Sequence, residues 1–536
     1  MRTRLLPLAA LFAAIVAWPA AASDKSDKPA KPTLVVRLAA LDNLIADARY
    51  LAELAGKGNE AEQAEKMLKA MAGDKGLEGL DTTKPMGLYG YLGPGGIDSQ
   101  AVLLLPIRDE KAFTDKMESF GLKPEKADGG AWKLDIAQIP FPIYFRFANK
   151  YVYATVRDAD VLDKDRLLDP ATVLAGSGFA SAVINLDGIP KELKEMALAQ
   201  TELQIANAKE KDVANETKAQ KAFRQAVLDE AFQRLKELLN DGGALSGRFE
   251  VDRKAGELSL TASLGGKPES KLAVGISELG KVTSVAAGAI GSDAAIGVQL
   301  DVALPKNLRE VLTAVVEEGM QQGLEKEKDE TKRKVAESLV KVVIPTIKMG
   351  ELDAGMSLRG PDSAGVYTVV GIGKIKDGKA VEAALKEALK ESPVKEQGSL
   401  ALDFAKVGDV NIHKAVPDKV DDKTKMTLGE GPVYFAFRDD AFIVAGGSGA
   451  LDAIKSAVAA GPAPGKIAQI DLAFSRFAKL MADRNKAAPD VAKKVFKGGD
   501  DTLTISLEGG AALKLGLRMK ARLVTFIAGL EEAKRE

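Results

Sequence analysis

The sequence predicts an α+β fold made by tandem duplication, in which each copy is a mostly antiparallel sheet with helices on one face. Short strand-like segments recur in the same order in both halves of the chain. Strand-like segments also follow one another directly, a connection typical of antiparallel neighbours. Residues 191–241 contain neither glycine nor proline, which adds one long projecting helix or helical hairpin to this fold.

The clearest repeat is an aromatic hairpin. Residues 143–155 (IYFRFANKYVYAT) recur as residues 433–445 (VYFAFRDDAFIVA), so that Phe145 corresponds to Phe435. Each segment has two β-type runs around a polar pair, the pattern of a β-hairpin. The other repeated segments are residues 107–113 with 375–381, 181–188 with 467–474, 245–250 with 503–508 and 257–264 with 512–519. An ordered series of matches predicts a duplication.

The first copy is expected at residues 33–281 and the second at residues 293–536, joined by a short apolar segment. The breakers AGSG and GPAPG divide each copy into a larger and a smaller lobe. The expected lobes are residues 33–175 and 176–281 in the first copy, and residues 293–460 and 466–536 in the second.

The elements of the first copy follow from its apolar patterns. In order they are a strand at 33–38, a helix at 41–71, strands at 86–92 and 100–107, a helix at 109–120, a strand at 132–136, the aromatic hairpin, a short helix from Asp158, a strand, the helical stretch 191–241, two strands and a closing helix. Asp109 and Asp377 stand where helix N-caps belong, because an aspartate carboxylate accepts a free backbone N–H there. The second copy has extra residues at 392–426, which predict an exposed loop.

Residues 1–22 predict a secretory signal peptide. Two arginines precede an apolar run from Leu5 to Trp18, and small residues up to Ala22 offer a cleavage site. The run is shorter than the roughly 20 residues that span a bilayer. Residues 23–32 predict a disordered linker. We therefore expect a periplasmic or extracellular protein with no membrane span after cleavage.

The composition excludes several kinds of site. The chain has no cysteine, so it has no disulfide, thiolate nucleophile or thiolate metal site. Its 75 basic and 76 acidic residues nearly cancel, and such a balance argues against a nucleic-acid partner. Aromatic residues make up 5% of the chain, which leaves few surfaces for stacking bases or sugars.

No combination of residues predicts a catalytic site. His413 is the only histidine and lies in a strand-like run without an identifiable partner, so we expect a surface or satisfied side chain. The Ser-x-x-Lys matches at residues 338–341 and 392–395 lack the companion motifs of penicillin-recognising enzymes.

Glycine-rich residues 90–96 predict a hairpin turn, and residues 446–450 lack the lysine of a phosphate-binding loop. Acidic clusters at residues 158–169 and 418–422 lack the pattern of an EF-hand and predict helix caps and loops. We therefore assign no catalytic, cofactor-binding or metal-ligating residue, and no cofactor.

The leader, the paired IYFRF and VYFAF hairpins and the [RK]-D-x-K-A block that begins at residues 108 and 376 resemble uncharacterised exported bacterial proteins of the planctomycete type. The resemblance covers most of the chain. It implies export and an unknown function, and it brings no site residues.

These observations favour a non-enzymatic exported protein that acts through its surface, as an envelope scaffold or interaction protein. Residues 191–241 are the candidate arm for docking a protein partner. The alternative is a carrier of an apolar ligand such as lipid, held between sheet and helices, with Phe141, Phe145 and Phe147 as candidate lining residues. An unrecognised hydrolase is the least favoured class.

Overall fold

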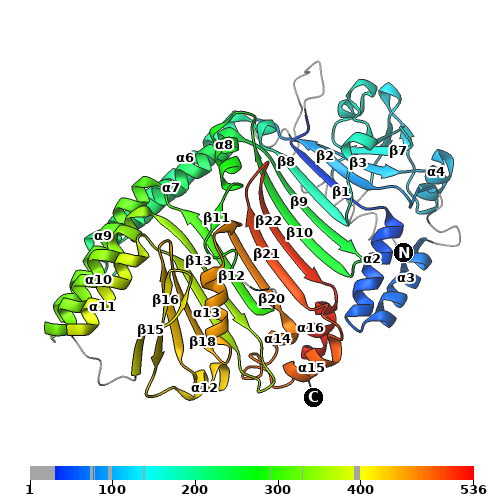
Figure 1. Ribbon diagram of the computed structural model, residues 1–536. Helices are drawn as coiled ribbons and strands as arrows, with labels where there is room; N and C mark the ends of the chain where they lie inside the picture. Colours follow the sequence, from blue (N-terminus) through cyan, green and yellow to red (C-terminus); the bar gives the residue numbers. More distant parts are fainter. Residues whose placement is uncertain are drawn as a thin grey trace. The chain divides into compact units, whose positions relative to one another are not determined.

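The computed structural model describes residues 31–72, 77, 79–94, 99–136, 139–289, 291, 293–328, 330–391 and 399–535. The signal peptide, most of the expected linker and residues 392–398 lie outside this range. The chain divides into two units. Unit 1 comprises Met1–Gln200, Lys236–Ala273 and Arg518–Glu532, and unit 2 comprises Thr201–Leu235, Val274–Leu517 and Ala533–Glu536. Both combine helices with antiparallel strands, as the α+β class predicts (Figure 1).

Unit 1 contains an antiparallel sheet with the strand order β10-β9-β8-β1-β2-β3-β7-β6-β5-β4. Its strands are β1 (Leu34–Leu38), β2 (Met86–Tyr91), β3 (Gln100–Pro106), β4 (Glu125–Lys126), β5 (Trp132–Leu134), β6 (Ile143–Ala148), β7 (Tyr151–Val156), β8 (Ala180–Asn185), β9 (Gly242–Asp252) and β10 (Glu257–Gly266). The aromatic hairpin is β6–β7. Its two turn residues, Asn149 and Lys150, have φ of 51° and 63°, the left-handed backbone that a tight primed hairpin turn requires.

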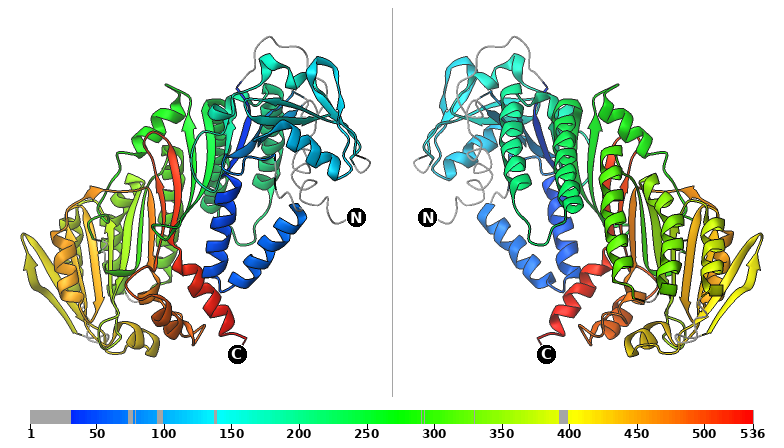
Figure 2. Two further views of the ribbon diagram at one scale, coloured as in Figure 1. Left: turned by 90° about the vertical axis from the view of Figure 1, so that its right-hand side faces the viewer. Right: turned by 90° about the vertical axis from the view of Figure 1, so that its left-hand side faces the viewer.

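Three helices of unit 1 lie side by side, α2 (Leu41–Leu54), α3 (Gly58–Ala72) and α16 (Arg522–Glu532) (Figure 2). Another helix, α4 (Glu110–Ser119), begins at the predicted N-cap, where the Asp109 carboxylate accepts the N–H of Ala112 at 2.6 Å. The short helix α5 (Pro170–Val173) is likewise capped by Asp169. The acidic cluster at 158–169 therefore contains the expected helix cap.

Unit 2 contains a second antiparallel sheet with the order β21-β20-β12-β13-β14-β18-β17-β16-β15. Its strands are β12 (Ala294–Ala303), β13 (Glu351–Arg359), β14 (Thr368–Lys374), β15 (Ser399–Val407), β16 (Val410–Val416), β17 (Val433–Arg438), β18 (Ala441–Gly447), β20 (Ala468–Ala473) and β21 (Thr502–Glu508). The second aromatic hairpin is β17–β18. Beside the sheet lie α9 (Lys306–Lys326), α10 (Glu330–Met349), α11 (Gly378–Glu391) and α13 (Ala450–Ala459).

Helices lie on both faces of the sheet in unit 2, not on one face as expected. Ile412 and Ala436 pack in one core cluster with Ile454 of α13. The next residue along β16, His413, points to the opposite face and contacts α11 through Glu382. Consecutive strand residues alternate between faces, so α13 and α11 cover opposite sides.

Unit 1 is also packed on both faces. Leu103 of β3 belongs to a cluster with Met117 of α4, whereas Leu104 belongs to a second cluster with Leu174. Strands that are apolar on both sides allow this arrangement, and the near-continuous apolar run of β3 is typical of such strands.

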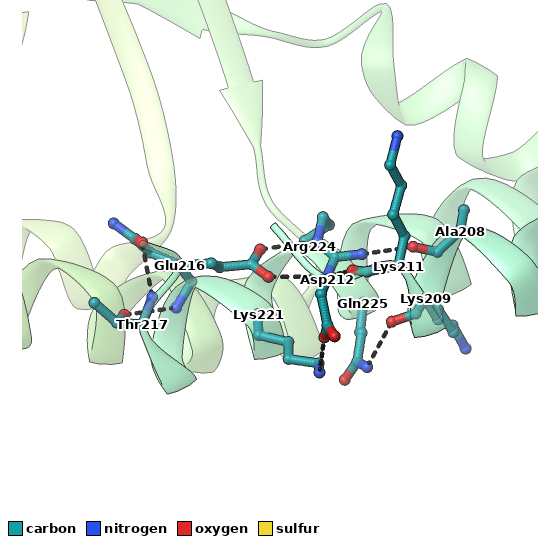
Figure 3. A network of polar contacts seen from close by, with 10 residues as sticks. Ala208, Lys209, Lys211, Asp212, Glu216, Thr217, Lys221, Arg224 and Gln225 are labelled. Atoms are coloured by element: carbon teal, nitrogen blue, oxygen red, sulfur yellow. Dashed lines mark hydrogen bonds and ion pairs between the residues drawn. The ribbon is translucent and has the colours of Figure 1, made fainter. Parts of the chain in front are cut away.

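The stretch 191–241 is a helical hairpin rather than one helix. It consists of α6 (Lys191–Glu210) and α7 (Lys218–Asp241). Arg224 of α7 fixes the turn: its guanidinium donates to the carbonyls of Ala208 and Lys211 at 2.6 and 3.1 Å and to the Glu216 carboxylate at 2.8 and 2.9 Å (Figure 3). These bonds satisfy carbonyls at the end of α6 that have no intrahelical partner.

Within unit 2 the hairpin is bonded to α9. The Thr217 hydroxyl donates to Glu318 at 2.8 Å, and Asn307 donates to Glu230 at 3.2 Å. Charge pairing also joins the two hairpin helices through Lys209 and Asp229. The outer half of the predicted arm is therefore held by side-chain contacts.

We predict that Arg224→Met loosens the turn of the hairpin. Four hydrogen bonds disappear, so amide exchange in residues 205–217 should become about tenfold faster, measured by hydrogen–deuterium exchange. The control is Arg234→Met, which removes an ion pair with Glu230 on the same helix. Equal exchange in both variants would contradict a special role for Arg224.

Candidate functional site

Four neighbouring strands of unit 2 present one sheet face made of apolar side chains, called here the apolar face. In antiparallel sheets, directly paired residues lie on the same face. Three rows cross β13, β12, β20 and β21: Leu358, Ile296, Leu472 and Leu503; Met356, Val298, Ile470 and Ile505; and Ala354, Leu300, Ala468 and Leu507. Leu352 and Val302 begin a fourth row.

The apolar face is partly exposed, although some polar side chains on its reverse side are buried. Leu352, Met356 and Ile470 are 53%, 43% and 38% exposed, although all three are large apolar side chains. On the reverse side of the same strands, Gln299 and Asp353 are buried. This is the opposite of the usual half-buried sheet, in which the apolar side faces the core.

Specific partners bury the polar side. The Asp353 carboxylate accepts the Ser284 hydroxyl at 2.6 Å and the Val285 N–H at 2.8 Å, and Gln299 donates to the Lys466 carbonyl at 3.3 Å. The polar groups are therefore satisfied inside unit 2, as buried polar groups must be.

A polar pocket of about 850 Å³ opens on this reverse side and is lined in part by Gln299, Asp471, Arg476 and Asp501. The Asp471 carboxylate accepts the Thr504 hydroxyl at 2.8 Å. The lining also includes apolar side chains such as Ala287 and Leu472.

Unit 1 has an apolar face of the same kind. Its rows are Leu34, Ile184, Leu245 and Leu264; Val36, Ala182, Gly247 and Ala262; and Leu38, Ala180, Phe249 and Leu260. Leu245 and Leu260 are 41% and 52% exposed. On the reverse side, Arg37 is buried and donates to the carbonyls of Leu174 and Gly178, both at 3.0 Å.

Such faces can bind apolar groups through burial alone, without hydrogen bonds or ion pairs. Burial of apolar surface contributes about 25 cal/mol per Å². Exposed apolar patches of several hundred Å² mark interaction or ligand-binding surfaces. The rows named above consist of apolar side chains and glycine.

His413 occupies a polar cluster on the opposite side of unit 2's sheet from α13. It lies on β16 as predicted, but it is fully buried. Its Nδ1 accepts the main-chain N–H of Asp403 at 3.0 Å. Its Nε2 lies 3.3 Å from Glu382 Oε1, within ion-pair distance but without hydrogen-bond geometry. Lys386 Nζ lies between the two carboxylates, 2.6 Å from Glu382 and 2.7 Å from Asp403.

The electrostatics of this cluster favour a neutral imidazole. Burial lowers the pKa of His413, and the Glu382 carboxylate only partly opposes this effect. Burial alone raises the pKa of Glu382, but hydrogen bonds from Lys386 and Asn411 outweigh it, and the net pKa is lowered. The pair Glu382 and Lys386 is therefore charged beside a neutral ring.

The cluster does not fit a metal site, although Glu382, Asp403 and His413 bring ligand-type atoms within 4.8 Å of one another. The ammonium of Lys386 already fills the position between the carboxylates. Because Nδ1 accepts a hydrogen bond, the proton of the neutral ring is on Nε2. Neither ring nitrogen then offers a free lone pair to a cation.

The remaining sequence motifs are structural. The Asp421 carboxylate accepts the Thr424 N–H at 3.0 Å, which caps α12 (Asp422–Leu428). Residues 338–341 lie within α10, and residues 446–450 lead from β18 into α13. Residues 90 and 91 end β2 and residues 92–94 begin the predicted β2–β3 connection, whereas residues 95, 96 and 392–395 lie outside the described residues.

The aromatic residues considered as ligand lining pack against one another. Phe145 is buried, stacks on Trp132 at 6.2 Å and meets Phe147 edge-on at 5.6 Å. The Arg157 guanidinium covers the Phe141 ring at 3.8 Å. Phe145, Phe147 and Trp132 thus belong to a core cluster of unit 1 and do not line an open site.

No family model matches this chain, and no curated protein matches it. A solved structure of TP0453, in its crystal form IV, is similar to part of it with 12% sequence identity. The similarity covers 44% of this chain and 77% of that one, with a TM-score of 0.21. A likeness this weak carries no argument about fold or function. Among the described residues, no helix is both long and apolar enough to cross a membrane.

We predict that Asp301→Asn stabilises the protein at pH 8 and has little effect at pH 4. Asp301 lies opposite Asp353 across β12 and β13. Burial first, and Asp353 second, raise its pKa to about 6. The folded state therefore holds this proton more tightly than the unfolded chain, and ionisation destabilises the fold as the pH rises from about 4 to 6.

The expected gain at pH 8 is roughly 1–2 kcal/mol, since solvent screens a half-buried carboxyl. Urea unfolding followed by circular dichroism at both pH values measures it. The control, Asp353→Asn, should be destabilising because Asp353 accepts two buried hydrogen bonds. A gain at pH 4 equal to that at pH 8 would contradict the assignment.

Proposed function

We propose that this chain is an exported, non-enzymatic protein that binds an apolar ligand, such as lipid acyl chains, on the apolar faces of its units. The observation that carries the proposal is the exposure of Leu352, Met356 and Ile470 on strands whose polar side is buried. The isolated protein is less stable when apolar side chains stay in water while a carboxylate is buried on the other side of the same strands. Binding acyl chains recovers that free energy.

Acyl chains suit the geometry of the face better than a peptide does. The rows run across paired strands, so the main-chain groups beneath them are already hydrogen-bonded within the sheet. An acyl chain forms no hydrogen bonds, so it suits a surface whose main-chain groups are already paired.

A scaffold that acts through the helical hairpin 191–241 is the second candidate. It is favoured by Met196 and Leu203, which are exposed on α6. The contacts of Thr217 and Glu230 with α9 weigh against it, because they use part of the outer half of the hairpin within the chain itself.

We propose further that the chain arose by tandem duplication at the boundaries inferred from the repeats. The support is the order of strand pairing. Nine strands of each unit pair in an equivalent order. In unit 1 the order is β9-β8-β1-β2-β3-β7-β6-β5-β4. In unit 2 it is β21-β20-β12-β13-β14-β18-β17-β16-β15. The resemblance to exported planctomycete-type proteins belongs to the same proposal.

Ligand binding is tested with fluorescent acyl probes of increasing length. Each added methylene contributes up to about 0.8 kcal/mol, so the affinity should rise steeply from eight to sixteen carbons. Four substitutions, Leu245→Asn, Leu260→Asn, Met356→Asn and Ile470→Asn, should weaken binding by at least about tenfold, since each removes an exposed apolar side chain from a face.

The control is Met426→Asn, which removes an exposed apolar side chain from α12, away from both faces. It should leave the affinity unchanged. Binding that does not depend on probe length, or that survives the four substitutions, would contradict the proposal.

Export predicts cleavage after Ala22. The mature protein recovered from outside the cytoplasm should therefore begin at Ser23, as N-terminal sequencing would report. A protein that keeps residues 1–22 would overturn the assignment of the leader.

A further inference from the structure

Strand β15 is held in an unusual conformation beside His413. Ala401 pairs with Lys414 and Ala405 with Ile412, so three residues of β15 stand opposite His413 alone. The middle one, Asp403, has φ of 53°. The result is a bulge, a feature that redirects side chains and locally ends regular pairing.

The bulge depends on the protonation state of the imidazole. Its central main-chain N–H, that of Asp403, donates to Nδ1 of His413 at 3.0 Å. A protonated imidazole has an N–H at both nitrogens and accepts no hydrogen bond. Two donors would then face each other, and the Asp403 N–H would lose its partner.

We propose that His413 is a pH-sensitive latch that fixes the β15 bulge when neutral and releases it when protonated. On protonation, the Nδ1–H gains an acceptor only if Asp403 rotates its carboxylate, now 3.8 Å away, toward the ring. That rotation withdraws Asp403 from Lys386 and from the main-chain bond together. The bulge therefore loses both contacts in one step.

The groups around the ring come from three elements. Glu382 and Lys386 lie on α11, Asp403 lies on β15, and the rings of Phe435 and Phe437 on β17 are 5.0 and 6.3 Å from the imidazole. Glu382 lies 3.3 Å from Nε2 and stabilises the imidazolium, whereas the neighbouring Lys386 and the apolar rings disfavour it.

Unit 1 shows that the sheet does not need this cluster. There the residue that pairs with Phe145 is Trp132, whereas in unit 2 His413 pairs with Phe435. Trp132 stacks on its partner ring at 6.2 Å, and Lys126 Nζ lies 5.9 Å from the centre of the Trp132 ring. An apolar ring thus suffices to pack this position, and the ionisable ring in unit 2 adds a response to pH.

The direction of the response follows from burial, which lowers the pKa of His413. A depressed imidazole pKa gives stability that is present above the unfolded value of about 6.5 and is lost as the pH falls below it. Release is therefore expected below pH 6.5 and not at neutral pH.

The single histidine makes the test direct. In protein labelled with ¹⁵N-histidine and purified without a histidine tag, the ring nitrogens should report the Nε2–H tautomer at pH 7.5. As the pH falls, the shift of Nδ1 to its protonated value should coincide with faster amide exchange in residues 399–407, by at least about tenfold after correction for intrinsic rates.

His413→Asn is the matched variant, because its amide oxygen can accept the Asp403 N–H and does not titrate. It should abolish the acid response of residues 399–407, and residues 132–134 of unit 1 should exchange alike in both proteins. The latch is overturned if Nδ1 carries the proton at pH 7.5, if the ring titrates without a change in β15, or if the variant keeps the acid response. Should the variant not fold, the ring titration and exchange of the unaltered protein still decide the question.

Discussion

The carboxylate of Asp353 is the interaction on which the architecture of unit 2 depends. It accepts the Ser284 hydroxyl and the Val285 N–H, and so ties residues that lie before β12 to the polar side of the sheet. Val285 belongs in turn to the core cluster that includes Ile454 of α13. A buried carboxylate is tolerated only with such partners. Residues 284 and 285 thus cover part of the polar side, whereas the apolar side of the same strands keeps exposed side chains such as Leu352 and Met356.

Local sequence signals predicted much of the frame. The hairpin β6–β7 and the caps formed by Asp109 and Asp377 appear where they were expected, because each depends on a few adjacent residues. The exposure of the apolar face was missed, although β12 alternates apolar and polar residues from Ile296 to Val302. Alternation shows that a strand has two different sides. Which side becomes buried depends on contacts outside the strand, here those of residues 284 and 285 with Asp353, which is 69 and 68 residues away along the chain.

The surroundings of His413 could not be predicted for a similar reason. Glu382 and Asp403 are 31 and 10 residues away along the chain, and they reach the ring from a helix and from a bulge. No glycine in the sequence of β15 marks the bulge or the left-handed backbone at Asp403. Similarly, the break between α6 and α7 carries no glycine or proline. It is stabilised by Arg224, a residue on the following helix.

The bulge in β15 also bears on how molecules of this protein behave at high concentration. Beyond its pairing with β16, β15 carries exposed Leu400, Leu402 and Phe404. A regular apolar strand at the border of a sheet is a template for adding strands from other chains, and a bulge interrupts that template. The three residues that stand opposite His413 interrupt the regular pairing pattern of this border, so it is a poorer template for a strand from another chain.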